Sequence, residues 1–137
     1  MEYIKRSAID DALSKVYRQY LTGHLELPQA LLEHIDSDIE VGISFYREFT
    51  ADKPHVHPVA EEHGYVLSGS VRCRILDGSG TEMEFDEGDF FVVRSGEPHA
   101  SKNAPGTKVL FIRSPGLNDK TIVEVDEETE RWLSSWD

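Results

Sequence analysis

Three histidines and one glutamate in the middle of the chain have side chains of the types that bind transition metals. His55 and His57 are two residues apart, so on an extended strand both imidazoles point to the same face. Glu62 follows shortly after them, and His99 closes a second segment further along the chain. Imidazole nitrogens and a carboxylate oxygen brought to one point suit a divalent transition metal. The pattern predicts one Fe, Mn, Ni, Co, Cu or Zn ion bound by His55, His57, Glu62 and His99.

Each of these residues taken alone has a simpler interpretation, since a single strand histidine or glutamate is normally a solvated or hydrogen-bonded side chain. Taken together, four protein ligands on an octahedral ion would leave two adjacent positions open. Dioxygen or a small bidentate oxygen ligand, such as a hydroxy acid, a keto acid or an enediol, would fit there. The ion would keep about one positive charge, which stabilises developing negative charge. A redox metal would favour a dioxygenase, and Zn or Ni an isomerase or lyase.

The composition limits the partners and the compartment. The 137 residues include 14 Lys and Arg against 26 Asp and Glu, a formal net charge of −12. Because such a surface repels phosphate groups, we expect no nucleic-acid and no membrane partner. Cys73 is the single cysteine and cannot form an internal disulfide, which is typical of a reducing compartment. With no signal-like start and no long apolar run, these features favour a cytoplasmic protein.

The elements that must position the four ligands are mostly strands. In residues 39–49, Val41, Ile43, Phe45, Arg47 and Phe49 alternate with smaller or polar residues, which predicts a strand with one apolar face. Further strands are predicted around 54–57, 62–68, 70–76, 81–85, 89–93, 99–103 and 107–113, separated by turns rich in Gly, Pro, Asp and Ser. Many short strands at this spacing indicate an all-β fold, a single antiparallel sandwich or barrel.

Helices are expected at both ends of this barrel. A capping-box-like sequence at Ser7 and apolar residues at helical spacing predict a helix that ends near Gly23. Residues 24–38 are ambiguous, although Pro28 would suit the start of a short helix. A short helical tail is predicted near the end, with Trp132 and Trp136 on its buried edge, packed on the barrel or on a second subunit. We therefore divide the chain into an N-terminal helical extension (1–38), a barrel core (39–115) and a C-terminal extension (116–137).

Two segments resemble the conserved motifs of the cupin superfamily. The segment His55-x-His57-x4-Glu62-x6-Gly69 is similar to the first motif, and Gly88-x5-Arg94-x-Gly96-x2-His99-x3-Asn103 to the second. Arg94 stands where the second motif usually has proline, and Phe49 where the first motif usually begins with glycine. The resemblance implies a β-barrel or jelly roll, a metal held at one mouth by the three histidines and Glu62, and frequent homodimers. Glu61 is a competing ligand because the spacing before this glutamate varies in the superfamily.

Candidate catalytic residues follow from strand alternation. Arg47 shares the apolar face of its strand and would clamp a substrate carboxylate if that face were interior, or would reach water if it were not. Arg113 invites the same two interpretations. Tyr46, Glu61 and His63 are possible acid–base groups. His63 and Tyr65 point opposite to Glu62 on an ideal strand, which favours a surface or subunit contact.

Three function classes follow from these residues. The first is a small metalloenzyme, a dioxygenase or an isomerase or lyase, acting on a small polar or anionic, oxygen-rich substrate. The second is a non-enzymatic module that binds a metal, a sugar or an organic acid. DNA-binding regulation is disfavoured because the chain has no basic patch. From the resemblance we also expect a homodimer.

Overall fold

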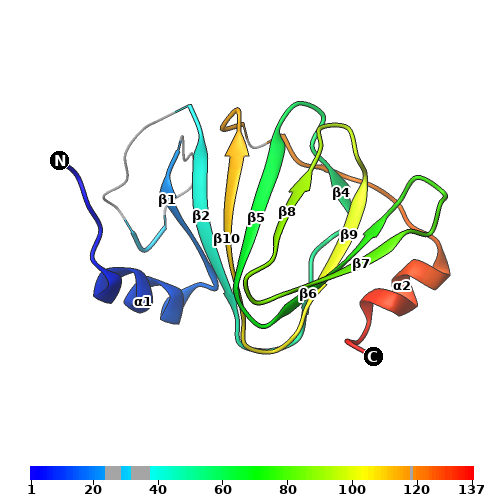
Figure 1. Ribbon diagram of the computed structural model, residues 1–137, viewed down its shortest axis with the longest axis horizontal. Coiled ribbons are helices and arrows are strands. Elements are labelled where there is room, and N and C mark those ends of the chain that lie inside the picture. Colours follow the sequence, from blue (N-terminus) through cyan, green and yellow to red (C-terminus); the bar gives the residue numbers. More distant parts are fainter. Residues whose placement is uncertain (24–28, 32–37, 118) are drawn as a thin grey trace.

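The computed structural model describes residues 1–23, 29–31, 38–117 and 119–137. Its strands form the body of the molecule, with one helix near each end of the chain (Figure 1). In chain order the elements are α1 (Arg6–Lys15), β1 (Arg18–Thr22), β2 (Glu40–Tyr46), β3 (Thr50–Ala51), β4 (His55–Val56), β5 (Glu61–Ser68), β6 (Ser70–Ile75), β7 (Glu82–Asp86), β8 (Phe90–Val93), β9 (His99–Asn103), β10 (Thr107–Ser114), β11 (Thr121–Ile122) and α2 (Glu127–Leu133). The predicted all-β fold with a helix at each end is confirmed.

Two antiparallel sheets face each other. One has the strand order β1-β2-β10-β5-β8, and the other has the order β11-β4-β9-β6-β7, with β3 also paired to β9. Strands from both sheets contribute to the buried apolar cluster between them, which consists of Val66, Val71, Cys73 and Val109 with Phe85 and Phe91 packed against it. Neither helix combines the length and the apolar composition that crossing a membrane requires, within the residues described.

The apolar face of β2 points outward, away from the barrel interior. Burial alternates so that Glu40, Gly42, Ser44 and Tyr46 point inward, whereas Val41, Ile43 and Phe45 lie on the half-exposed outer face. The reason is the Phe111 ring of the neighbouring strand β10, which lies against Gly42. A Cβ atom at Gly42 would lie 2.1 Å from Phe111 Cζ, so only glycine leaves room for this ring. Of the two interpretations that the sequence left open for this face, the structure supports the outward one.

The first helix is shorter than predicted. It ends at Lys15, and the residues expected to continue it form strand β1, which pairs with β2 from Arg18–Ser44 to Thr22–Val41. Val16 and Tyr17 are residue types that favour strands, and pairing with β2 satisfies backbone groups that a lone helix end would leave open. The short helix considered at Pro28 lies outside the described residues.

The C-terminal tail docks on its own barrel. Asp126 caps α2 by accepting a hydrogen bond from the Thr129 backbone N–H. The buried Lys102 ammonium on β9 donates hydrogen bonds of 2.8 Å to the carbonyl oxygens of Trp132 and Ser135. The Arg72 guanidinium lies 4.1 Å from the Trp136 ring centroid, a cation–π contact that holds the last residues against β6.

Candidate metal centre

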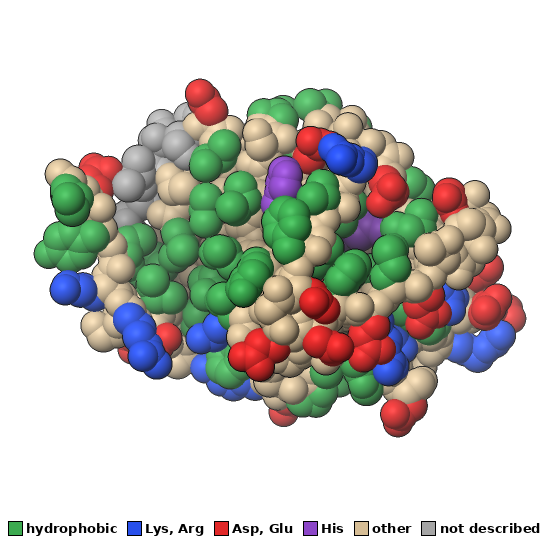
Figure 2. Space-filling model, in the orientation of Figure 1, with side chains coloured by type: hydrophobic (Ala, Val, Ile, Leu, Met, Phe, Trp, Pro, Cys, Tyr) green, Lys and Arg blue, Asp and Glu red, His purple; other side chains and the backbone are tan. Residues whose placement is uncertain are grey.

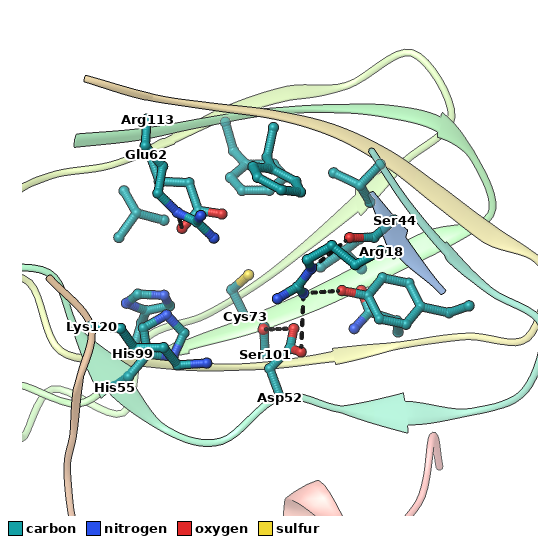
Figure 3. A pocket seen from close by; sticks show the side chains of 17 residues that line it. Arg18, Ser44, Asp52, His55, Glu62, Cys73, His99, Ser101, Arg113 and Lys120 are labelled. Atoms are coloured by element: carbon teal, nitrogen blue, oxygen red, sulfur yellow. Dashed lines mark hydrogen bonds and ion pairs between the residues drawn. The ribbon is translucent and has the colours of Figure 1, made fainter. Parts of the chain in front are cut away.

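The predicted metal ligands meet at one end of the barrel interior. His55 on β4 pairs directly with His99 on β9, and Glu62 on β5 reaches the same place from the opposite sheet. One ligand atom from each of these three residues lies within 4.8 Å of the other two (Figure 3). His57, in the connection after β4, has its Nε2 atom 3.2 Å from Glu62 Oε2.

All three histidines present the nitrogen that a metal would need. The Nδ1 atom of His55 lies 2.7 Å from the Lys53 carbonyl oxygen, and that of His99 lies 3.1 Å from the Glu97 carbonyl oxygen. A carbonyl oxygen only accepts hydrogen bonds, so Nδ1 carries the proton in both rings. The Nε2 atoms then keep free lone pairs, the arrangement found around ligating histidines.

The surroundings of the His57 Nε2 atom indicate whether these residues fit a metal. The side chain is 2% exposed, and its Nε2 atom has no hydrogen-bond partner among the described residues despite its short distance to Glu62. A buried nitrogen left without a partner costs stability, and a cation between His57 and Glu62 would remove that cost. The donor set therefore fits a divalent transition metal.

Electrostatics hold these groups in the protonation states that metal binding requires. Burial lowers the pKa of His55 to about 4, and burial also lowers the pKa of His99. Burial acts against ionisation of Glu62, but the contacts with His57 and Arg113 outweigh it and hold the pKa of that carboxyl well below its usual range. The neutral imidazoles of His55 and His99 thus face an ionised carboxylate.

Asp119, a residue that the sequence did not reveal, orients His57. Its Oδ1 atom lies 3.2 Å from His57 Nδ1, and its Oδ2 atom accepts hydrogen bonds from the backbone N–H groups of Val59 (2.7 Å) and Ala60 (3.0 Å). The carboxylate therefore holds both the ring and the connection that carries it. No spacing pattern pointed to Asp119, because 62 residues separate it from His57.

Three of the four predicted ligands, His55, Glu62 and His99, line a cavity of about 60 Å³ between the sheets, and His57 lies outside this lining. Two of the predicted catalytic residues, Tyr46 and Arg113, also line it. Arg113 Nη1 donates to Glu40 Oε2 at 3.0 Å, and Arg113 Nε lies 3.6 Å from Glu62 Oε2, so this guanidinium lies directly behind the metal ligands. Burial and the charge of Asp52 raise the pKa of Tyr46 to about 12, against the opposing charge of Arg18.

Away from the histidines, the cavity is lined by a polar group that the sequence analysis missed. Arg18 on β1 donates hydrogen bonds of 2.9 Å to the Ser44 hydroxyl and to the Tyr46 hydroxyl. Asp52 lies beside the same guanidinium and accepts a hydrogen bond from Ser101. Arg18 was missed because its segment was assigned to a helix.

Three other candidates lie elsewhere. Arg47 is exposed, donates to the Leu13 carbonyl oxygen and lies over the Phe45 ring, so it does not reach the cavity. The premise of its role as a carboxylate clamp was an interior face, and that face points outward. Glu61 pairs with Arg94 at 3.0 Å on the surface, while Glu62 joins the metal group. His63 stacks on Phe90 on the outer face of the sheet.

Comparison with known proteins supports the architecture. A family model described as "Cupin domain" matches residues 48–112. An uncharacterised conserved protein with a double-stranded β-helix domain from Klebsiella pneumoniae aligns with TM-score 0.55 and 22% identity over 64% of this chain and 76% of that one. KdgF from Halomonas sp. aligns with TM-score 0.55 and 20% identity over 74% of this chain and 80% of that one.

Oxalate decarboxylase from Bacillus subtilis, in a tryptophan-to-phenylalanine variant, aligns with TM-score 0.54 and 23% identity over 63% of this chain but only 24% of that one. A comparison with curated protein sequences gives no match. At identities this low, the solved structures share the fold alone. The cupin-domain model spans all four predicted ligands, and together with the shared fold it identifies residues 48–112 as a cupin domain.

Proposed function

We propose that this protein is a small metal-dependent enzyme, a dioxygenase or an isomerase or lyase, that acts on a small anionic, oxygen-rich molecule. The proposal depends on one observation above all: the imidazoles of His55 and His99 have their Nδ1 atoms bound by carbonyl oxygens, so their Nε2 lone pairs face Glu62 across a cavity. Such an arrangement costs stability unless a cation is present, because it desolvates nitrogen and oxygen lone pairs together.

A bound metal would be held by His55, His57, Glu62 and His99, and would supply Lewis-acid or redox chemistry. Mn(II) centres are named for the oxalate decarboxylase that shares the fold, which supports a metal without choosing this one. Arg113 would hold Glu62 in place and add positive charge beside the reacting group. Tyr46, kept protonated by its raised pKa, is a proton donor within the same cavity.

The charge of the cavity supports an anionic substrate. The lining residues include three cations, Arg18, Arg113 and Lys120, and two carboxylates, Asp52 and Glu62. Glu40 pairs with Arg113 and Asp119 with His57, so carboxylates exceed cations by one. A divalent ion would therefore leave a net charge of about +1, which attracts a small anion into a protein whose overall charge is −12.

The volume limits the substrate to a small one. A cavity of about 60 Å³ holds about five water-sized groups, at roughly 10–15 Å³ each. This size suits acids of two or three carbons. The cavity residues are compatible with both oxidative and non-oxidative chemistry, and oxygen uptake distinguishes the two.

The test begins with elemental analysis of the purified protein, followed by reloading with each candidate metal. The loaded protein is then offered two- and three-carbon hydroxy, keto and dicarboxylic acids. Oxygen uptake would identify a dioxygenase, and an isomerised or cleaved product without oxygen uptake an isomerase or lyase. An absence of metal binding with all four ligands intact would contradict the proposal.

A second candidate function is a non-enzymatic binding module for a metal or a small organic acid. It is favoured by the polar residues opposite the metal group, because Arg18, Tyr46 and Asp52 are already engaged with one another and with serine hydroxyls. Tight binding of metal and acid without turnover of any acid in the panel would support this alternative.

A further inference from the structure

Strand β1 places an arginine side chain in the cavity, and this strand lies outside the part of the chain that the cupin model matches. Arg18 lies before residues 48–112, yet it lines the same cavity as His55, Glu62 and His99. In the close view, its guanidinium projects into the cavity on the far side of Cys73 from the histidines (Figure 3). The cavity therefore has two chemically different regions, a metal-binding one and a cationic one.

The guanidinium of Arg18 is only partly used. Its Nε and Nη2 atoms donate to the neutral hydroxyls of Ser44 and Tyr46. Its Nη2 atom also forms an ion pair with Asp52 at 3.6 Å, longer than a hydrogen bond, and Asp52 accepts a hydrogen bond from Ser101. Nη1 makes no hydrogen bond to any residue that the structure describes. An arginine of this kind keeps donors for a further planar anion.

A purely structural role for Arg18 would be to tie β1 to β2. Backbone pairing from Arg18–Ser44 onward already joins these strands, and the Tyr17 carbonyl oxygen also accepts from the Phe45 N–H at 2.7 Å. The Arg18 side chain nevertheless turns inward and is 23% exposed, at the edge of an apolar wall that includes Phe111. Moving a charge into this position costs desolvation free energy, which the ion pair with Asp52 offsets in part and a bound anion would offset further.

We propose that Arg18 binds a carboxylate of the substrate, and that the substrate is a short acid with two polar ends. One end would use the open positions at the metal, and the other would lie on the guanidinium of Arg18. This inference rests on the proposed function. The two regions share one small cavity of about 60 Å³, which favours a short acid such as one of two or three carbons.

The experiment measures metal binding first and acid binding second, both by calorimetry on the full chain. Zinc affinity is determined for the wild type, Arg18→Gln and Arg47→Gln. Oxalate and malonate, which have two carboxylates, and acetate, which has one, are then titrated into the zinc-loaded proteins. Arg47→Gln is the matched control because it removes an arginine that lies outside the cavity.

Arg18→Gln should weaken the affinity for oxalate or malonate, whichever binds more tightly, by roughly 10- to 100-fold, the range for a charged hydrogen-bonded pair. Acetate binding and zinc affinity should change by no more than about 3-fold, and Arg47→Gln should match the wild type throughout. Asp52→Asn should act in the opposite direction and tighten acid binding, because it removes the competing carboxylate beside Arg18. A purely structural Arg18 would not predict this gain.

The outcomes separate the two proposals. If zinc does not bind the wild type, the proposed function fails. If zinc binds but both acids bind Arg18→Gln as tightly as the wild type, or bind neither protein, this inference fails while the metal site stands. If Arg18→Gln does not fold, Asp52→Asn decides, and unchanged acid affinity in that variant would overturn the inference.

Discussion

At the scale of single residues, the candidate centre depends on hydrogen bonds that prepare each ligand before any metal arrives. The Nδ1 atoms of the three histidines donate hydrogen bonds to two backbone carbonyls and one carboxylate. Removing a ligand should therefore empty the site without unfolding the barrel. His57→Ala and His99→Ala should each lower zinc occupancy to below about a tenth of the wild-type value, as measured by elemental analysis after dialysis.

Glu61→Gln is the control for these ligand variants, since Glu61 pairs with Arg94 on the surface. It should retain full occupancy, whereas Glu62→Gln should lose it. The opposite result for the two glutamates would show that the ligand register is wrong by one residue.

Asp119 gives a second prediction at this scale. Asp119→Asn keeps the size of the side chain but removes the charge that fixes the His57 tautomer. Because partners of ligating histidines contribute about 10- to 100-fold to metal affinity, zinc binding should weaken by that factor with the fold unchanged. Asp126→Asn, at the cap of α2, alters a carboxylate far from the centre and should leave zinc affinity unchanged. Equal affinities in wild type and Asp119→Asn would contradict the role assigned to Asp119.

The raised pKa of Tyr46 predicts how the free energy of unfolding changes at alkaline pH. Its pKa is about 12 in the folded protein, raised mainly by burial, and about 10 in an unfolded chain. The folded state holds this proton more tightly, so its contribution, about 3 kcal/mol at most, is complete below pH ~10 and is lost as pH rises towards 12. Urea unfolding of Tyr46→Phe should lose less stability over that range than the wild type. Tyr65→Phe, on the exposed face, should behave like the wild type.

At the scale of elements, the sequence predicted what local patterns determine. The strands around 62–68, 70–76, 99–103 and 107–113 occur within one residue of their expected limits, because glycine-containing turns bound them. The predicted helix end near Gly23 was wrong, and the direction of the apolar face of β2 could not be decided, because both depend on distant residues. Phe111 needs the space at Gly42, and β1 forms only because β2 offers an edge.

The same errors explain what was missed at the site. Assigning Arg18 to a helix kept it away from the cavity, whereas Arg47, a catalytic candidate only if its face were interior, lies outside it. The metal ligands were predictable because residue type and short spacing identify them. Asp119 was not, because its contact with His57 exists only after folding.

The packing of Phe111 against Gly42 makes a prediction about β2. Gly42→Ala places a methyl group where the ring lies, so overpacking should destabilise the protein by about 1–3 kcal/mol in urea unfolding. Phe111→Leu should cost stability as well, by opening a gap. The double variant should lose less than the sum of the two, because the smaller side chain makes room for the methyl. Strictly additive losses would show that the two residues do not share this space.

At the scale of the whole molecule, the outer face of the β1-β2-β10-β5-β8 sheet is largely apolar. Apolar side chains gather over its strands, with charged ones concentrated nearer the rim (Figure 2). The outward-facing members on β2, β10, β5 and β8 are Val41, Ile43, Phe45, Leu110, Ile112, Tyr65, Leu67, Phe90 and Val92. Sheets with one solvated face normally alternate apolar and polar residues, so this face suits a protein contact.

A second copy of this chain is the partner that we predict for this face. A chain of charge −12 repels its copies unless the contact lacks carboxylates, and the central strands β2 and β10 present none outward. Light scattering after size exclusion should give twice 15.5 kDa for the wild type. Phe90→Glu, which charges a side chain that is 59% exposed, should shift the protein to monomer, while Ile122→Glu, at 56% exposure on the other sheet, should not. A wild type that stays at 15.5 kDa at high concentration would exclude the dimer, and the apolar face would then need a different partner.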